Sequence, residues 1–231
     1  MLAVSVILPA FNERENILAL IEEVARGLQG LDHEILVVDD NSPDGTAQAV
    51  AARAFPGVRL IVRRDMRGYA RSIRRGIEEA RGDLLVLMDS DFNHLPRYIP
   101  AMLEALRTHD AVSASRFLPG GRMVPAWRGA CSWCFNGFIR VMTGSRMTDN
   151  LYGFFAVKRE ALMRCPFDEI FTGFGDYGIR LLFHLQKNGA RVHEFPAVYG
   201  LRRHGTGRRQ FFSMLWQYAR ATWQLTRKGR I

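Results

Sequence analysis

The sequence predicts an α/β fold with a mostly parallel central sheet and helices on both of its faces. Short apolar segments of strand character alternate with amphipathic helical segments over most of the 231 residues. The strand segments are almost continuously apolar, which is typical of parallel strands that are buried on both faces. Polar and acidic residues follow several of them directly, at the sheet edge where such folds bind their ligands.

The first half of the chain supplies three strand–helix units and a fourth strand. The first helix opens at Asn12, carries an apolar stripe at helical spacing, and is closed by Gly27 and Gly30. The second strand runs into a segment from Asp39 to Thr46 that is dense in turn and N-cap residues. Strands are expected at residues 4–8, 34–38, 58–62 and 83–87, and helices at residues 12–28, 47–54 and 68–80.

The second half continues the pattern less regularly. Residues 96–106 form a helix with an apolar inner face, and a glycine-rich loop, 171–176, precedes another helix. Further helices are expected at residues 127–142 and after Asp176, and strands at 110–116, within 149–157 and at 191–195.

An Asp-x-Asp motif follows the fourth strand. In an extended segment alternate side chains face the same way, so Asp89 and Asp91 can reach one hard cation together, with Asn93 as a third oxygen ligand. Magnesium usually takes one or two protein carboxylates and fills its sphere with substrate phosphates. A turn with two solvated acids would leave the same short motif, so the motif alone does not decide between the two.

Two other strands end in comparable clusters. The pair Asn12 and Glu13 follows the first strand, and the pair Asp39 and Asp40 follows the second. Scattered surface acids would not fall three times at strand ends, so the coincidence favours a ligand site along this edge. The glycine patterns of dinucleotide-binding and P-loop proteins are both missing from the sequence, which disfavours those two classes.

Composition excludes other classes of protein. The 48% hydrophobic and 24% charged content is that of a globular chain, and no uncharged apolar run approaches the roughly 18 residues of a spanning helix. The apolar start lacks a basic leader and is too short for a signal peptide, so the expected location is the cytoplasm. Three cysteines make no disulfide framework, and Cys131 and Cys134 are interpreted as two thiols on one helix face rather than a redox or zinc site.

The positive charge is concentrated at the end of the chain. The net charge is +9, and no Asp or Glu follows Glu194. Such a patch attracts the phosphates of nucleic acids, lipid headgroups or small substrates. The basic residues after this point are Arg202, Arg203, Arg208, Arg209, Arg220, Arg227, Lys228 and Arg230.

A C-terminal helix is expected within residues 206–231, as an extension of a main domain over residues 1–205. Its apolar and aromatic residues share one helical face, and its polar and basic residues share the other. That pattern fits a helix lying in a membrane interface, or a helix docked on its own domain or on a partner. The first face is assigned Phe211, Phe212, Leu215, Trp216, Ala219, Thr222 and Trp223, and the second Ser213, Gln217, Arg220, Gln224 and Arg227.

Several segments together resemble family-2 glycosyltransferases of the GT-A fold. Within that family the sequence is similar to polyprenyl-phosphate sugar synthases of the dolichol-phosphate mannose synthase type. The resemblance reaches to about residue 208. The segments that carry it are residues 6–13, 37–46, 88–91, 94–96, 115–117 and 153–155, and the spacing of Arg202 and Gly205.

The resemblance implies a role for each matching residue. Asp89 and Asp91 would hold Mg²⁺ or Mn²⁺ against a diphosphate, with Asn93 completing the shell, and Ser90 would touch the ribose or the sugar. Arg116 and Arg202 would contact phosphates, and Arg208 stands where the family has a lysine. The residues that would line the nucleotide pocket are Pro9, Phe11, Glu13, Val38 and Asp40. The sequence departs from the family pattern at Gly68-Tyr69-Ala70, usually Gly-Leu-Gly, and at Tyr152, usually serine.

The implied reaction is inverting transfer of a sugar, mannose from GDP-mannose by default, to a polyprenyl monophosphate. Peripheral membrane contact, with or without a membrane-anchoring partner, would bring the enzyme to this acceptor. A phosphate monoester is already anionic near neutral pH, its second pKa being about 6, and needs no general base. An alternative is a hydroxyl acceptor, for which Asp176 would serve as the base unless it only caps the following helix.

A non-enzymatic alternative is an RNA- or membrane-binding protein that uses the basic tail. Carboxylates at the strand ends repel nucleic-acid phosphates, so we expect no nucleic acid among the partners.

Overall fold

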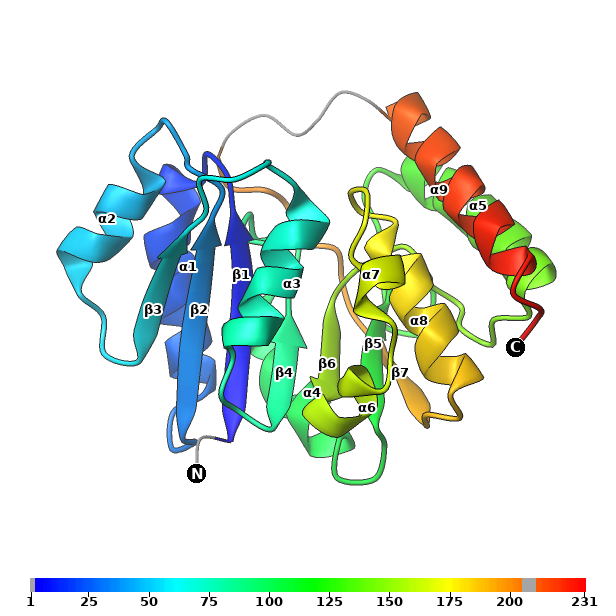
Figure 1. Ribbon diagram of the computed structural model, residues 1–231, viewed down its shortest axis with the longest axis horizontal. Helices are drawn as coiled ribbons and strands as arrows, with labels where there is room; N and C mark the ends of the chain where they lie inside the picture. Colours follow the sequence, from blue (N-terminus) through cyan, green and yellow to red (C-terminus); the bar gives the residue numbers. More distant parts are fainter. Residues whose placement is uncertain (1–2, 205–210) are drawn as a thin grey trace.

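The computed structural model describes residues 3–204 and 211–231, and only the backbone of residues 211–213. Its centre is a seven-stranded sheet in the order β3-β2-β1-β4-β6-β5-β7 (Figure 1). The strands are β1 (Val4–Ala10), β2 (His33–Asp39), β3 (Val58–Val62), β4 (Leu84–Leu87), β5 (Ala111–Ser115), β6 (Phe155–Lys158) and β7 (Val192–Pro196).

The sheet is mostly parallel, as predicted, but one strand runs against the others. The strands β1 to β4 are mutually parallel, and β7 pairs parallel with β5. The strand β6 lies antiparallel between β4 and β5, so Leu87 at the end of β4 pairs with Phe155 at the start of β6. The segment that leads into β6 therefore meets the segment that leaves β4 at the sheet edge formed by the carboxyl ends of the parallel strands.

Helices cover both faces of the sheet (Figure 1). Alternate residues of β1 point to opposite faces, so Val6 and Leu8 pack with α1 and α4 while Ile7 packs with α3. The helices are α1 (Arg14–Gly27), α2 (Thr46–Arg53), α3 (Tyr69–Glu79), η1 (Pro96–Tyr98), α4 (Ile99–Ala105), α5 (Ala126–Thr143), α6 (Arg159–Met163), α7 (Phe167–Ile170), α8 (Tyr177–Lys187) and α9 (Phe211–Thr226).

The expected elements are present, with differences at their ends. The helix predicted at 96–106 divides into η1 and α4, each of which starts with a proline in its first turn. Proline has no N–H to donate and suits that position. The short helices α6 and α7 were not expected, because four or five residues are too few to show a helical period.

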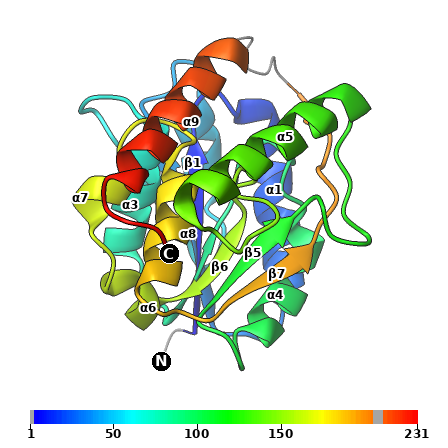
Figure 2. The ribbon, with the colours of Figure 1, turned by 90° about the vertical axis from the view of Figure 1, so that its right-hand side faces the viewer.

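The C-terminal helix α9 packs on its own domain, against α5 and α8 (Figure 2). Its buried stripe consists of Tyr218, Ala221, Thr222 and Leu225. The predicted faces are therefore partly wrong. Thr222, assigned to the aromatic face, is buried, while Trp216 and Trp223 are exposed on the side that also carries Arg220 and Arg227. Among the described residues, none of the helices has the length and apolarity to cross a bilayer.

Candidate active site

The Asp-x-Asp motif lies at the carboxyl end of β4, but it is not extended. The strand ends at Leu87, and the backbone then turns through Phe92, whose φ is +69°. Within this turn Asp91 accepts hydrogen bonds from the backbone N–H of Asn93 at 3.0 Å and from its side-chain amide at 2.7 Å. The three predicted metal ligands thus gather through a turn, and the expectation of an extended segment is wrong.

The two motif carboxylates sit in different surroundings. The Asp89 side chain is 30% exposed, whereas that of Asp91 is 11% exposed. Burial, together with the charge of Asp89, raises the pKa of Asp91 above its ordinary value. A cation between the two carboxylates would relieve that repulsion, so the pair is suited to bind a positive charge.

Arg202 joins two of the predicted strand-end clusters. Its guanidinium donates to Asp91 at 3.1 Å and to Glu13 at 2.5 Å. Arg202 belongs to a segment that crosses the Asp-x-Asp turn at Gly200, whose N–H donates to the carbonyl of Asn93 at 2.8 Å. A Cβ at position 200 would lie 1.9 Å from the carbonyl oxygen of Phe92, so only glycine permits this approach.

Glu13 is buried beside Arg202 and next to α1. Asn16 donates to its carboxylate at 2.7 Å. Burial raises the pKa of Glu13 to about 7, although the hydrogen bond from Asn16 and the charge of Arg202 lower it in part. The buried carboxyl group with the raised pKa is therefore in direct contact with the guanidinium of Arg202.

The second cluster is held by Arg63. Its guanidinium donates to Asp40 at 2.6 Å and to Ser72 on α3 at 2.9 Å. The other carboxylate oxygen of Asp40 accepts the N–H of Gly68 at 2.9 Å. Asp40 thus fixes the start of α3 and forms no described contact with the Asp-x-Asp motif. Its neighbour Asp39 lies inside its own loop, where it accepts two hydrogen bonds from Ser42.

The other residues predicted to line the nucleotide pocket differ in accessibility. Phe11 is partly exposed and stacks under the guanidinium of Arg67, 3.8 Å from the ring centre. Ser90 is buried and donates to the carbonyl of Pro9 at 2.8 Å, so its hydroxyl holds β1 and β4 together. Val38 is fully buried in the core beneath α3. Its side chain is therefore not accessible at the surface, and the predicted role in the nucleotide pocket stays a prediction.

Arg116 does not reach the Asp-x-Asp motif in this structure. Its guanidinium forms a buried, two-point ion pair with Asp149, at 2.7 and 2.8 Å. Tyr152 and Tyr199 flank it, 5.1 and 6.0 Å from the guanidinium to the ring centres. Most of its hydrogen-bonding capacity toward a phosphate is therefore already used. Arg208 lies outside the described residues.

Asp176 stands immediately before α8 and does not cap that helix with its side chain. It accepts the N–H of Phe174 at 2.7 Å and pairs with Arg180 at 2.9 Å. Both contacts hold the loop that precedes α8, and the residue is only 3% exposed. The carboxylate is therefore engaged in the structure of the loop.

Two residues that the sequence did not single out for a role position Asp89. The ring of His94 accepts the backbone N–H of Asp89 at 2.8 Å, and its other nitrogen lies 2.9 Å from the carbonyl oxygen of Tyr152. Because a carbonyl only accepts, Nε2 carries the proton. The hydroxyl of Tyr69 donates to the Asp89 carboxylate. One signal in the sequence pointed to this contact: position 69 carries a tyrosine where the family pattern has a leucine.

The protein offers few ligands for a metal beyond these. Within residues 3–204 and 211–231 no group of three or more His, Cys, Asp or Glu side chains is arranged to hold an ion. A hard cation at Asp89 and Asp91 would thus need oxygen ligands from a substrate, which is the usual arrangement for Mg²⁺ beside phosphates.

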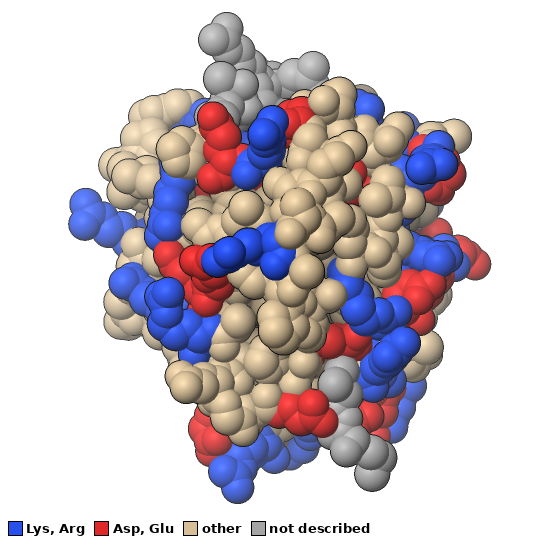
Figure 3. All heavy atoms as spheres, turned by 90° about the vertical axis from the view of Figure 1, so that its left-hand side faces the viewer, with Lys and Arg blue, Asp and Glu red and all other residues tan. Residues whose placement is uncertain are grey.

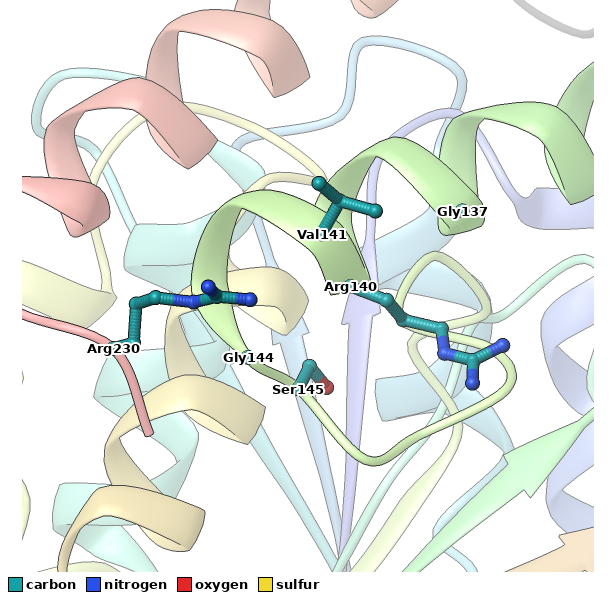
Figure 4. A pocket seen from close by; sticks show the side chains of 6 residues that line it. All are labelled: Gly137, Arg140, Val141, Gly144, Ser145 and Arg230. Atoms are coloured by element: carbon teal, nitrogen blue, oxygen red, sulfur yellow. The ribbon is translucent and has the colours of Figure 1, made fainter.

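Two hollows lie near the surface. One, of about 340 Å³, adjoins Glu13 and is lined by Asn12, Arg14, Glu15, Asn16, Asp44 and His204. The other, of about 420 Å³, lies at the end of α5, where Arg140 and Arg230 project from either side (Figure 4). No predicted metal ligand lines either hollow.

Comparison with known proteins gives the family. The model of "Glycosyl transferase family 2" matches residues 5–165, more than half of the chain. This chain belongs to glycosyl transferase family 2. The matched region contains both motif aspartates, the strands β2 to β6, and all of β1 except Val4. The predicted enzyme class, a glycosyltransferase, is thereby confirmed.

This glycosyltransferase is similar in sequence to mannosyltransferases from several organisms. It is 35% identical over 212 residues to the dolichol-phosphate mannosyltransferase of Pyrococcus furiosus, covering 87% of this chain and 58% of that protein. It is 34% identical to the undecaprenyl-phosphate mannosyltransferase of Micrococcus luteus, covering 84% and 82%. The dolichol-phosphate mannosyltransferase of Saccharomyces cerevisiae is 33% identical, and the match covers 87% of this chain and 79% of that protein. The chain thus spans less than two thirds of the Pyrococcus relative but most of the other two.

A solved structure confirms the fold. The glucosyl-3-phosphoglycerate synthase of Mycobacterium tuberculosis, in complex with Mn²⁺, UDP and phosphoglyceric acid, superposes with a TM-score of 0.75 at 24% identity. The match covers 99% of this glycosyltransferase and 79% of that chain. The predicted GT-A fold is therefore confirmed.

Proposed function

We propose that this glycosyltransferase moves a sugar, with inversion, from a nucleotide sugar to a polyprenyl monophosphate. The observation that carries the proposal is the cluster of Glu13, Asp91 and Arg202 at the end of β4, where carboxylates for a cation and a guanidinium for a phosphate meet. The three relatives named above, which are dolichol-phosphate or undecaprenyl-phosphate mannosyltransferases, support this acceptor. GDP-mannose is the donor we favour, by the same resemblance.

The proposed cofactor is Mg²⁺ or Mn²⁺, bound by Asp89 and Asp91 with Asn93 beside them. The hard oxygen donors and the raised pKa of Asp91 suit a divalent cation. When bound, the ion would neutralise charge on the departing nucleoside diphosphate. The solved Mycobacterium structures, which contain Mn²⁺ or Mg²⁺ with UDP, support metal use in this fold.

The chain's own groups have distinct proposed tasks toward the donor. Arg202 would move from Asp91 and Glu13 to the diphosphate oxygens, which bind a planar guanidinium by charge-assisted hydrogen bonds. Phe11 would offer its ring to the nucleotide beside Arg67, while Asp40 would act through the start of α3. Pro9 and Ser90 hold the floor of the site.

The acceptor phosphate needs a cationic partner but no general base. The resemblance assigns this task to Arg116, whose guanidinium lies between Tyr152 and Tyr199. Its buried pair with Asp149 would have to open before the guanidinium could bind the phosphate and hold it in line with the anomeric carbon.

Peripheral contact with a membrane would bring the enzyme to its lipid acceptor. The helices α5 and α9 lie side by side (Figure 2). Their exposed side chains include Trp127, Trp133, Trp216 and Trp223. Exposed tryptophan beside arginine suits the membrane–water interface. The opposite end of the molecule carries interspersed acidic and basic groups (Figure 3), a mixture that does not favour nucleic acid.

A panel of radiolabelled nucleotide sugars tests the proposal. Each is incubated with polyprenyl phosphate, with and without Mn²⁺, and the organic phase is counted. We expect label to move into the organic phase with one donor, only with metal, and not with the Asp91→Asn variant. Transfer of label to a water-soluble hydroxyl acceptor instead would overturn the proposed acceptor class.

A further inference from the structure

We propose that Tyr69 is a positioning residue that sets the orientation of the Asp89 carboxylate and links it to the loop before α8. The inference rests on the proposed function, because it takes Asp89 as a ligand for the metal. Tyr69 is the first residue of α3 and is far from Asp89 in the sequence, yet its hydroxyl donates directly to Oδ1 of that carboxylate.

The ring of Tyr69 is held from the other side by two aromatic residues. Its centre lies 5.3 Å from that of Phe174 and 5.7 Å from that of Tyr177. Tyr177 is fully buried, and its own hydroxyl donates to the carbonyl of Gly153 at 3.2 Å. These contacts leave the ring of Tyr69 little freedom to turn away from Asp89.

The backbone of Tyr69 is fixed as well. Gly68 donates its N–H to Asp40, and Arg63 ties Asp40 to Ser72 one turn into α3. The predicted nucleotide residue Asp40 therefore places Tyr69, and Tyr69 places Asp89. His94 completes the arrangement, because its Nδ1 accepts the backbone N–H of Asp89 and its Nε2 lies 3.6 Å from Oδ2 of the same residue.

The hydroxyl of Tyr69 is the donor in this contact, because a carboxylate oxygen accepts. With Oδ1 held by the hydroxyl, Oδ2 of Asp89 lies 3.6 Å from Nε2 of His94, so the direction of the carboxylate is set from both sides. Groups that orient a metal ligand in this way typically contribute about tenfold to a hundredfold to metal affinity.

The Tyr69→Phe variant tests the inference, because it removes the hydroxyl and keeps the ring. Binding of Mn²⁺ is measured by electron paramagnetic resonance with GDP or UDP present, a readout that does not depend on turnover. We expect Mn²⁺ affinity to fall about tenfold, while the melting temperature of the metal-free protein stays close to that of the parent. The matched control is Tyr98→Phe, whose hydroxyl contacts the N–H of Val198 and the side chain of Arg97.

The Asp89→Asn variant separates the two proposals. If Asp89→Asn loses Mn²⁺ binding and Tyr69→Phe binds like the parent, the positioning role is refuted while the metal site stands. If Asp89→Asn binds Mn²⁺ like the parent, the metal site is misplaced and the inference about Tyr69 falls with it. A loss in Tyr69→Phe but not in Tyr98→Phe, with the fold intact in both, supports the positioning role.

Discussion

Arg202 donates to Asp91 across 111 residues of sequence, at 3.1 Å. The contact joins the segment that follows β7 to the turn that follows β4, in the middle of the chain, so two distant parts of the sequence meet at the proposed metal site. The guanidinium neutralises the carboxylates here, and under the proposed function the same group would bind a diphosphate.

Replacing Arg202 should weaken donor binding. We expect Arg202→Ala to raise the dissociation constant for the nucleotide sugar at least tenfold, about 1.4 kcal/mol, because a phosphate-binding group is lost. Arg202→Lys should recover only part of the lost affinity, since an ammonium cannot form the two parallel hydrogen bonds of a planar guanidinium. Calorimetric titration measures the effect. The control is Arg203→Ala, a neighbour that pairs with Glu23 and lies over Phe92, and equal losses in both variants would contradict the assignment.

Glu13 should make stability depend on pH. Its pKa is about 7 in the folded protein against 4.5 for an ordinary glutamate. The contribution of Glu13 to the free energy of unfolding is therefore fully present below about pH 4.5. It is lost as pH rises through about 7, and the loss is about 3 kcal/mol at most. Relative to the parent, Glu13→Gln should therefore gain unfolding free energy between about pH 5 and pH 8.5. Denaturant unfolding with a chelator present measures this difference.

The control for the pH effect is Glu15→Gln, in the first turn of α1. The Glu15 side chain is 71% exposed, so its replacement removes a carboxylate that folding leaves largely in water. A pH-independent difference between Glu13→Gln and the parent would show that burial does not shift the pKa of Glu13.

Asp176 should prove to be a structural residue. Asp176→Asn breaks the partly buried pair with Arg180, which should lower the unfolding free energy by about 1–3 kcal/mol. Turnover with polyprenyl phosphate should stay within about tenfold, because that acceptor needs no base. Arg180→Gln breaks the same pair but keeps the carboxylate. Near-complete loss of turnover in Asp176→Asn alone, with donor binding intact, would establish Asp176 as a base.

The exposed tryptophans of α9 should contribute to membrane binding. We expect Trp216→Ser combined with Trp223→Ser to reduce sedimentation with anionic liposomes several-fold, because each indole places apolar area in the interface. Leu31→Ser, an exposed apolar residue beyond the end of α1, is the control. Unchanged sedimentation of the double variant would remove the membrane proposal.

The sequence predicted the elements well, because apolar periodicity is a local property. It also predicted that Asp89, Asp91 and Glu13 lie along one edge, since parallel strands align their carboxyl ends. It could not predict the ion pair of Arg116 with Asp149, or the hydroxyl of Tyr69 on Asp89, because such contacts depend on how distant loops fold onto the edge. The predicted faces of α9 were partly wrong because periodicity shows that a helix has an apolar side but not which residues its neighbours cover. Here α5 and α8 determine which residues of α9 are buried.

The position of β6 has a consequence for the order in which the chain acquires structure during synthesis. The strands β3, β2, β1 and β4 are all made within the first 87 residues, whereas the second neighbour of β4 is β6, which ends at residue 158. We expect the nucleotide-facing half to assemble on the ribosome first, with one open edge at β4. A chain stalled before residue 155 would expose that edge to other chains, so aggregation of such truncated products is the hazard that this topology carries.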